Sequence, residues 1–361
     1  MRDNEQAIYD QIERDLLELP AANSAVEAAA MAMLLHYRII RFRGKVMIKV
    51  PKPYPHFVPM DNELFEWAVR PILGYMPRRH TSNAYDYVCT TADNVTAYSR
   101  CILFGAGTSQ QVVWDMERLA VRTDIPLDDC VWRSPYVPMP TTKPIKFIMD
   151  LAGGDMRLYS DIMQSLAPLV MAQKPVGVIW WTGDNMAGKI ALMEALNKIF
   201  PDHLTSLTVK QLNGGRSNTP LLNSALGNVV VDSGGQITNT EIYKSIGAHE
   251  DFSVHRYHSQ GGIVVRGNVH HIFSADTAPA FYARNLSIDR RTHTVPFSHV
   301  NNAQTTLPNS IYGQLVAEMC RYAAFIKQQS FSYKWSDVGG ERKKSEPAQS
   351  CPGSASPEFR W

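Results

Sequence analysis

The stretch VGVIWWTGDNMAGKIALMEALNKIF, residues 176–200, constrains the fold of this chain more than any other part of the sequence. Its apolar start has the pattern of a buried strand, and Gly183 follows directly. After Gly188 the apolar residues recur at helical spacing, so we expect a helix packed through Ile190, Leu192, Met193, Leu196 and Ile199. A buried strand, a glycine-containing loop and a helix in this order predict part of an α/β sheet.

The loop has the spacing GxxxxGK, which is typical of phosphate-binding loops. Backbone N–H groups at the helix start would hold phosphate oxygens, and Lys189 would reach the β- and γ-phosphates. Ile190 stands where such loops usually carry Ser or Thr to hold magnesium. A strand–helix turn without a ligand is the alternative. The residues expected to bind ATP or another nucleoside triphosphate, with Mg²⁺, are Gly183, Asp184, Asn185, Met186, Ala187, Gly188, Lys189 and Ile190.

Three later segments would complete a nucleotide site. The apolar run LGNVVVDSGG contains Asp232 at its end, which could hold Mg²⁺ directly or through water, whereas Ser233 stands where a hydrolysing ATPase often has Glu. The run VHHIFSADTAP contains Asp276, where many nucleotide-driven motors place Asn near the γ-phosphate. Arg290 and Arg291 precede another apolar segment, and a guanidinium from a neighbouring subunit can stabilise a transferring phosphoryl group. An isolated arginine pair is more often a surface ion-pair site.

The order of predicted elements suggests three parts of the chain. Strand and helix patterns alternate from residue 174 to 297, which favours an α/β sheet. The Pro-rich residues 134–144 are typical of a linker. We therefore expect an N-terminal α+β domain at 1–140, a second domain at 146–330 and a flexible tail at 331–361. Further expected elements are hairpins near 38–49 and 102–118, a helix capped by Asp61, and helices within 146–171 and 308–329.

Four phrases follow one another over residues 174–298: TGDNMAGKIALMEALNKIF, LGNVVVDSGG, IYKSIGAHEDFSVHRYHSQGGIVVRGNVHHIFSADTAP and SIDRRTHTVPF. In order and spacing they resemble the superfamily 3 helicases, especially the poxvirus, phage and plasmid primase-helicase branch. The resemblance implies a P-loop NTPase motor domain of AAA+-like fold with a parallel sheet, preceded by a smaller mixed α+β domain. It also implies a ring-forming, commonly hexameric helicase that moves on single-stranded or forked DNA during viral, phage or plasmid replication. The chain contains no recognisable primase motif, so priming would need a separate primase or polymerase.

The resemblance also carries roles onto individual positions. Lys189 matches the phosphate lysine, Asp232 the strand acid and Asp276 the sensor position, and either Arg290 or Arg291 matches the arginine that acts across a subunit boundary. The segment SVHRYHSQGGIVV falls where the family has a DNA-contacting hairpin, and Arg256 and His258 match its basic positions. The residues themselves predict a hairpin there, and Tyr257 at a basic tip could stack on a base. An ordinary surface hairpin is the alternative.

The departures from the family pattern bear on activity. Ile190 cannot ligate Mg²⁺, Ser233 cannot replace a carboxylate, and Asp276 adds negative charge near the γ-phosphate position. These changes predict weak or absent hydrolysis. One hypothesis is an active replicative helicase with an unusual site. The rival is a non-hydrolysing P-loop scaffold that oligomerises and binds DNA beside an active partner. A small-molecule enzyme using the Cys or His residues is a third hypothesis, which the absence of HExxH and of triad spacing disfavours.

Composition limits the partners and the compartment. The formal charge is 36 − 34 = +2, so any attraction to nucleic acid must come from local basic patches. The five cysteines are odd in number and form no CxxC pair, which favours a reducing, cytoplasmic compartment over a disulfide framework. The acidic N-terminal residues do not resemble a signal peptide, and no apolar run reaches about 18 residues, so we expect no membrane span.

Overall fold

A computed structural model describes residues 100–125, 127, 130–184, 188–214, 222, 225–231, 233–255, 262–265, 267–297 and 307–335, and parts of the first 99 residues between Ala30 and Asn94. The chain divides into two compact units, Met1–Ser99 and Arg100–Trp361. The sequence instead suggests a domain boundary between residues 140 and 146. Within the described residues, no helix has both the length and the apolar character needed to cross a membrane.

The first unit contains a four-stranded sheet with the order β3-β2-β1-β4. Its strands are β1 (Ile39–Phe42), β2 (Lys45–Val50), β3 (His56–Pro59) and β4 (Asp93–Asn94). β1 and β2 are antiparallel, which confirms the hairpin expected near 38–49. The Asp61 carboxylate accepts a hydrogen bond from Leu64 N at 2.8 Å, which confirms Asp61 as a helix cap.

The second unit begins with another four-stranded sheet, in the order β7-β6-β5-β8. Its strands are β5 (Cys101–Phe104), β6 (Val112–Asp115), β7 (Ala120–Arg122) and β8 (Trp132–Ser134). β5 and β6 are antiparallel, as expected for the hairpin near 102–118. Trp114 Nε1 donates to Val170 O at 2.9 Å, and Ala172 N donates to Met116 O at 2.8 Å. These bonds attach this sheet to the helical segment that follows it in the chain.

The largest sheet of the second unit has five strands, all parallel, in the order β10-β11-β15-β9-β17. They are β10 (Leu204–Thr205), β11 (Gly227–Val230), β15 (His270–Ala275), β9 (Val178–Thr182) and β17 (Thr292–Pro296). β9, β11 and β15 are buried throughout, as expected for parallel strands that are covered on both faces. The expectation of an α/β fold with a parallel sheet is confirmed.

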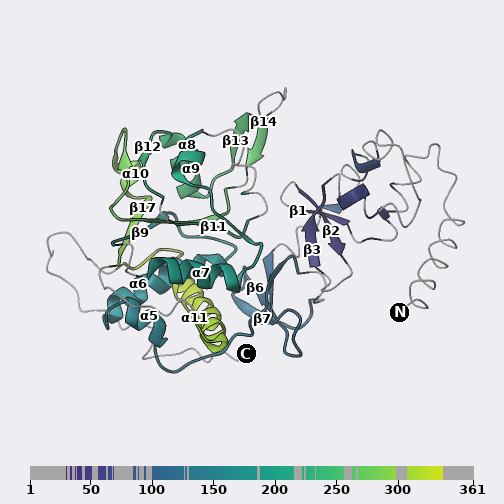
Figure 1. Cartoon of the computed structure of the whole chain (residues 1–361), viewed down its shortest axis with the longest axis horizontal. Helices are drawn as coiled ribbons and strands as arrows, with labels where there is room; N and C mark the ends of the chain where they lie inside the picture. Colours follow the sequence, from purple (N-terminus) through teal and green to yellow (C-terminus); the bar gives the residue numbers. More distant parts are fainter. Residues whose placement is uncertain are drawn as a thin grey trace, which may run out of the picture. The chain divides into compact units, whose positions relative to one another are not determined.

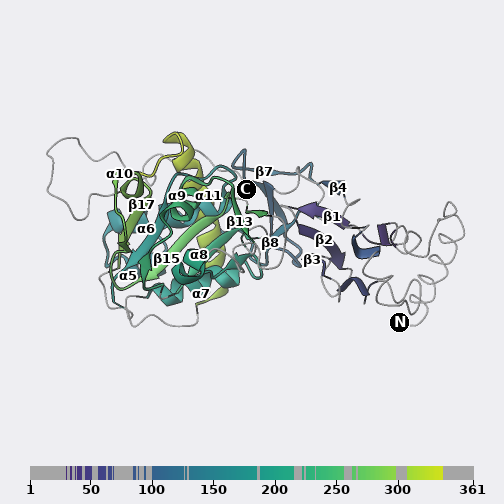
Figure 2. The same cartoon turned by 90° about the horizontal axis from the view of Figure 1, so that it is seen from above.

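Helices cover both faces of this sheet (Figures 1 and 2). One side carries α5 (Lys146–Leu151), α6 (Met156–Leu166), the 3₁₀ helix η3 (Ala167–Val170), α7 (Lys189–Ile199) and α11 (Asn309–Gln328). The other side carries α8 (Val209–Gly214), α9 (Thr240–Ala248) and α10 (Leu286–Asp289). Adjacent indoles on β9 show the two faces, because successive strand residues point to opposite sides. Trp180 Nε1 donates to Tyr243 OH on α9 at 3.1 Å, and Trp181 Nε1 donates to Ser165 Oγ on α6 at 3.0 Å.

Two small pairings lie outside the large sheet. β12 (Gln236–Ile237) pairs in parallel with β16 (Ala280–Phe281). β13 (Phe252–His255) and β14 (Gly262–Val265) form an antiparallel hairpin, as the sequence predicts. The residues between β13 and β14 lie outside the part of the chain that the structure describes.

Candidate phosphate-binding site

Gly183 begins the glycine loop at the carboxyl end of β9. Its N–H donates to Asp276 O at 3.2 Å, while Thr182 O accepts from Phe297 N at 2.6 Å. The loop therefore starts between the ends of β15 and β17, the two strands that flank β9. Gly183 has φ +127°, and a Cβ there would lie 1.8 Å from Phe297 O. Glycine is thus required at this position for both conformation and space.

Gly188 ends the loop and begins the following helix. It is the N-cap of α7 with φ +80°, a left-handed conformation that favours glycine. The helix begins at Lys189, where the sequence places it, so its first N–H groups and its positive dipole end border the loop. A helix start of this kind is suited to an anion. Asn185, Met186 and Ala187 lie outside the described residues.

Lys189 is almost fully buried, at 1% relative exposure. Its Nζ donates to Gly183 O at the start of the loop and, at 3.1 Å, to Ala275 O at the end of β15. The ammonium group therefore lies beneath the loop, at the carboxyl ends of two central strands. In open α/β sheets, ligands bind at this edge. The sequence motif locates the lysine, but it gives no sign of the carbonyl of Ala275, because a backbone contact requires no particular side chain.

Ile190 points away from the core and is 42% exposed. The expectation that it packs with Leu192, Met193, Leu196 and Ile199 is wrong for Ile190 alone, since the other four are buried. The buried face of α7 begins at Lys189, and Ile190 is turned about 100° from it around the helix axis. An apolar side chain therefore occupies the position expected to hold a metal-binding hydroxyl.

The two described residues that follow Lys189 supply no side-chain ligand for Mg²⁺. Ile190 and Ala191 have no side-chain oxygen, and among the described residues no group of three or more His, Cys, Asp or Glu could hold a metal ion. Asp184 is exposed beside the loop. Asp232, the expected metal ligand, lies outside the described residues. We therefore assign no step to a metal at this site.

Ser233 has a structural contact that the sequence does not reveal. It is 1% exposed, its N–H donates to Ser274 O at 2.6 Å, and its Oγ accepts from Val209 N at 3.2 Å. The hydroxyl therefore binds the first N–H of α8. The position where a hydrolysing enzyme often has a water-polarising Glu is here a buried contact between the segment that follows β11 and the start of α8.

Asp276 follows β15 directly and its side chain is exposed. Its backbone oxygen accepts the Gly183 N–H bond, so the residue lies next to the start of the loop. Asp184 follows Gly183, and Asp276 follows the Ala275 carbonyl that binds Lys189. The structure thus brings Lys189, Asp184 and Asp276 to one end of the sheet.

Arg290 and Arg291 lie at the other end of the sheet. They precede β17, whose first residue Thr292 pairs with Val178 at the start of β9, while the loop follows the end of β9. The five residues of β9 span about 15 Å at about 3.3 Å per residue. The Arg291 guanidinium binds Ser287 O at 2.9 Å and Ser287 Oγ at 2.7 Å, both through Nη1. Arg290 is exposed, and its side chain has no ion pair or hydrogen bond to any described residue.

The predicted DNA-contacting residues Arg256, Tyr257 and His258 lie outside the described residues. The strands that would carry them, β13 and β14, pair in register from Phe252 opposite Val265 to His255 opposite Gly262. The hairpin is confirmed as an element, whereas the role of its tip stays a prediction.

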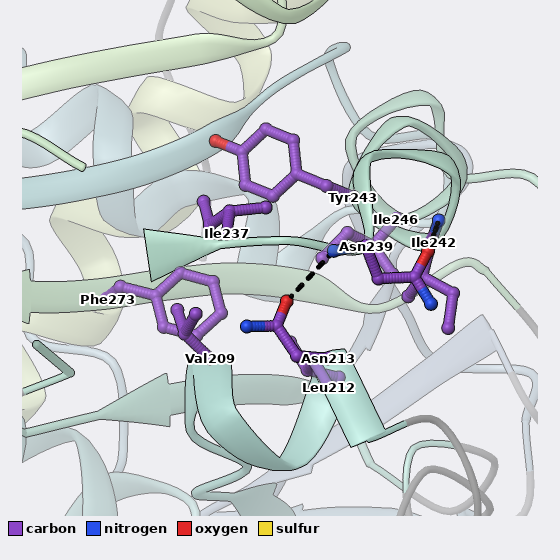
Figure 3. A pocket seen from close by; sticks show the side chains of 9 residues that line it. All are labelled: Val209, Leu212, Asn213, Ile237, Asn239, Ile242, Tyr243, Ile246 and Phe273. Atoms are coloured by element: carbon purple, nitrogen blue, oxygen red, sulfur yellow. Dashed lines mark hydrogen bonds between the residues drawn. The ribbon is translucent and has the colours of Figure 1, made fainter. Parts of the chain in front are cut away.

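A pocket between α8 and α9 lies away from the glycine loop (Figure 3). Isoleucine, leucine, valine and aromatic side chains make up most of its lining. Its polar residues Asn213 and Asn239 belong to the surrounding framework, since Asn213 Oδ1 accepts from Asn239 N at 3.2 Å. Asn213 also binds Thr238 N and Gln236 O. No residue of the described loop lines this pocket, and its lining carries no cation for a phosphate.

The three cysteines that the structure describes and the histidines of β15 do not form a reactive site. Cys101, Cys130 and Cys320 are buried and form no disulfide with one another, and burial raises the pKa of Cys101 to about 11. Such a thiol is not readily ionised. His270 and His271 face opposite sides of β15, as the sequence predicts. His270 Nε2 lies 2.7 Å from Ser165 O, and His271 stacks near Phe273. Their arrangement does not support the small-molecule enzyme hypothesis.

No family model matches the sequence, and no curated protein matches it. Similar solved structures include three of the C-terminal region of NrS-1. The A form apo structure is 14% identical with a TM-score of 0.49, and the match covers 85% of this chain and 69% of that chain. The A form apo structure of region 305–718 is 13% identical with a TM-score of 0.48, and the match covers 85% of this chain and 69% of that chain. The apo structure of the same region is 14% identical with a TM-score of 0.49, and the match covers 84% of this chain and 69% of that chain. Similarity at this level assigns no function to the chain.

Proposed function

We propose that this chain binds a nucleoside triphosphate at the Gly183–Lys189 loop and acts on DNA as a ring-forming helicase or translocase with slow turnover. The single observation that carries the proposal is the position of Lys189. Its buried ammonium group contacts carbonyls at the ends of β9 and β15, beneath a glycine loop that leads into a helix N-terminus. These are the features that phosphate recognition needs.

Phosphate binding requires a small change around Lys189. One of the two carbonyl contacts of Nζ would be exchanged for a phosphate oxygen, and the N–H groups at the start of α7 would supply further hydrogen bonds. A charge-assisted bond to phosphate is stronger than a bond to a neutral carbonyl. The buried ammonium therefore supplies the driving force for the exchange.

Slow turnover follows from two side chains. Ile190 supplies no metal-binding hydroxyl, and the buried Ser233 hydroxyl serves the start of α8. A positioned acid–base group is worth about 10²–10⁴ in rate, and its loss would leave a nucleotide-binding site with little hydrolysis. The same two residues favour the second candidate function, a non-hydrolysing P-loop scaffold that oligomerises and binds DNA beside an active partner.

Ring assembly is the part of the proposal that involves Arg290 and Arg291. Within one copy the arginines and the loop lie at opposite ends of β9, so an arginine can reach a loop only from a neighbouring copy. Of the two, Arg290 has the free guanidinium among the described residues, whereas Arg291 is held by Ser287. We therefore assign the subunit-bridging role to Arg290 and a structural role to Arg291.

Nucleotide binding is tested with two lysine variants on one helix. Lys189→Met should weaken binding of a fluorescent ATP analogue by about 10–100-fold, because it removes a charged hydrogen-bond donor. Lys198→Met is the control, since Lys198 also lies on α7 but contacts Tyr312 OH at 3.2 Å. Equal affinities of the two variants would contradict the phosphate site, as would a wild-type chain that binds no nucleotide at millimolar concentration.

Turnover separates the two candidate functions. A helicase or translocase with weak hydrolysis should release phosphate slowly and faster with single-stranded DNA, whereas the scaffold should release none. Ile190→Thr restores the hydroxyl on an exposed position and should raise the rate. Pairing it with Ser233→Glu, which would supply the Glu that a hydrolysing ATPase often has there, should fail to raise the rate further, because the carboxylate would be buried in place of the bond to Val209. A wild-type rate of about 1–10 s⁻¹, ordinary for an enzyme, would contradict slow turnover.

DNA binding is tested at the β13–β14 hairpin. The net charge of +2 leaves local basic residues to attract single-stranded DNA, so binding should weaken steeply with salt. Arg256→Ala should lower the affinity and flatten the slope of the salt dependence. If the slope does not change, the DNA site lies elsewhere, and the basic hairpin near residues 38–49 becomes the next candidate.

A further inference from the structure

The surface around α10 combines two exposed apolar side chains with a free cation. Tyr282 is 78% and Leu286 86% exposed, although both are large and apolar. Arg290 lies one helical turn after Leu286, since Arg290 N donates to Leu286 O at 3.1 Å. Residues so spaced share a helix face. We call Leu286 and Arg290, together with Tyr282 in the segment between β16 and α10, the α10 face.

The other arginines near α10 are already occupied. Arg284 Nε binds Asp289 Oδ1 at 2.6 Å, and Arg291 binds Ser287. Arg290 alone among these three has no side-chain partner within the part of the chain that the structure describes. The α10 face therefore offers one uncommitted guanidinium beside exposed apolar surface.

The end of the sheet that carries the glycine loop has the complementary character. Asp184 and Asp276 are exposed there, and neither carboxylate has an ion pair or hydrogen bond to the described residues. Ile190, 42% exposed, follows Lys189, whose Nζ contacts the residues just before both acids. We call Asp184, Ile190 and Asp276 the loop face. Its two carboxylates and one apolar side chain match the guanidinium and apolar side chains of the α10 face.

One copy cannot bring its own two faces together. Arg290 precedes the strand that pairs with the start of β9, and the loop face follows the end of β9. Figure 1 shows α10 on the side of the sheet that carries α9, and α7, which begins at the loop, on the opposite side. Two different faces that complement each other make a head-to-tail contact, and such contacts generate rings when the rotation closes.

We propose that Arg290 of one copy binds Asp276 and Asp184 of the next copy directly, with Leu286 and Tyr282 packed beside Ile190. The inference rests on the proposed ring assembly and specifies its contact. It explains two departures from the family pattern together. Asp276 supplies an anion where a γ-phosphate would otherwise attract the arginine, and Ile190 supplies apolar contact area where a hydroxyl would serve a metal. The subunit contact therefore forms without nucleotide and is held by a charge pair.

Charge reversal tests the pair by sedimentation velocity of the full chain without nucleotide. Wild-type protein should associate with increasing concentration and dissociate as salt rises. Arg290→Asp and Asp276→Arg should each weaken association at least about thirtyfold, the lower end of the loss expected for one partner of a buried charge pair. The double variant Arg290→Asp with Asp276→Arg should recover most of the association. Arg157→Asp, at an exposed arginine on α6, is the control and should associate like wild type.

Several outcomes would overturn the pair. The charge pair is wrong if either single charge-reversal variant associates as strongly as wild type. It is also wrong if the double variant associates no more strongly than the single variants. Asp276→Asn keeps the residue's shape and backbone bond, so a loss of association there cannot be attributed to misfolding. Lys189→Met should lose nucleotide binding yet associate normally. If wild type associates only with nucleotide, the direct pair is wrong while the nucleotide site stands. If nucleotide fails to bind but charge reversal behaves as described, the pair stands without it.

Discussion

Gly183 carries a steric constraint that can be separated from its backbone conformation. Its φ is +127° and its absent Cβ would meet Phe297 O, whereas Gly235 has φ +123° and a Cβ there would meet no described atom within 4 Å. Gly235→Ala should therefore cost only the conformational strain, about 1–3 kcal/mol. Gly183→Ala should cost more, because the loop must also move away from β17. Urea unfolding of both variants measures the difference, and equal midpoints would show that the contact with Phe297 relaxes freely.

Single residues also show where sequence reasoning succeeds and where it stops. The spacing GxxxxGK located Lys189 and the start of α7, because local glycine chemistry and helical periodicity are written in neighbouring residues. The same reasoning placed Ile190 in the packed face, and the structure exposes it. It also treated Ser233 only as a missing carboxylate. Its bond to Val209 joins residues 24 positions apart, and no local pattern reports such a contact.

At the scale of elements, α11 is held to α6 by a buried acid. Glu318 accepts from Tyr159 OH at 3.0 Å and from Arg321 Nε at 2.8 Å, and it is 3% exposed. Glu318→Ala should destabilise the chain by about 1.5–3 kcal/mol, the range for hydrogen bonds to a charged group. Glu117→Ala is the matched control, since it removes an exposed carboxylate paired with Arg100 and should cost about 0–1 kcal/mol.

Thermal unfolding of the two variants provides the comparison. If Glu318→Ala costs no more than Glu117→Ala, water or another side chain replaces the lost carboxylate, and the network does not secure α11. A further variant, Tyr159→Phe, removes both the donor to Glu318 and the acceptor that Ile145 N uses at 3.2 Å, so it should cost more than Glu117→Ala.

Long periodic elements were predictable, and very short ones were not. The helix expected at 308–329 is α11, and both strands of the hairpin around the predicted DNA-contacting tip are present. β10, β12 and β16 have only two residues each, too few to show a period of two, so their pairing depends on distant partners. The helical stretch expected within 146–171 divides into α5 and α6 around Gly153 and Gly154, which have positive φ. Two adjacent glycines were the local signal for that break.

At the scale of the whole molecule, the position of the domain boundary can be measured. The compact units meet at residues 99 and 100, whereas the Pro-rich linker suggests a boundary near 140. Residues 100–140 bond to the rest of the unit through Trp114, Met116 and Met139. Met139 N donates to Gly313 O at 2.9 Å. A fragment of residues 100–361 should therefore unfold cooperatively in urea. A fragment of residues 141–361 should be much less stable, because buried Trp114 and Trp132 would no longer cover it. Equal stability of the fragments would support the linker instead.

We expect the second unit to be sensitive to acid because of buried His270 and His271 at the amino end of β15 and partly buried His249 at the end of α9. His249 Nε2 donates to Pro175 O at 2.8 Å and His270 Nε2 to Ser165 O at 2.7 Å, while both ring nitrogens of His271 have no hydrogen-bond partner among the described residues. Burial, and secondly the nearby Lys174 ammonium, lower the pKa of His249 from 6.5 to about 4. Burial lowers the pKa of His271 to about 3, and that of His270 also falls well below 6.5.

The sign of the pH dependence follows from these lowered values. Above pH 6.5 the histidines are neutral in both the folded and the unfolded chain, so their full contribution to stability is present. As the pH falls from 6.5 towards about 4, the unfolded chain takes up protons that the folded chain refuses, and stability is lost. Each histidine contributes a slope of up to about 1.4 kcal/mol per pH unit in this window.

His271→Leu isolates one of these contributions. The substitution removes a titrating ring that makes no hydrogen bond to the described residues, so stability at pH 7.5 should be unchanged or slightly higher. Between pH 6.5 and 4 the variant should lose stability less steeply than wild type, because its unfolding takes up about one proton fewer. Urea midpoints across that range measure both slopes. If they coincide, His271 is protonated in the folded chain or is already solvated there, and the acid sensitivity of the unit arises from His249 and His270 alone.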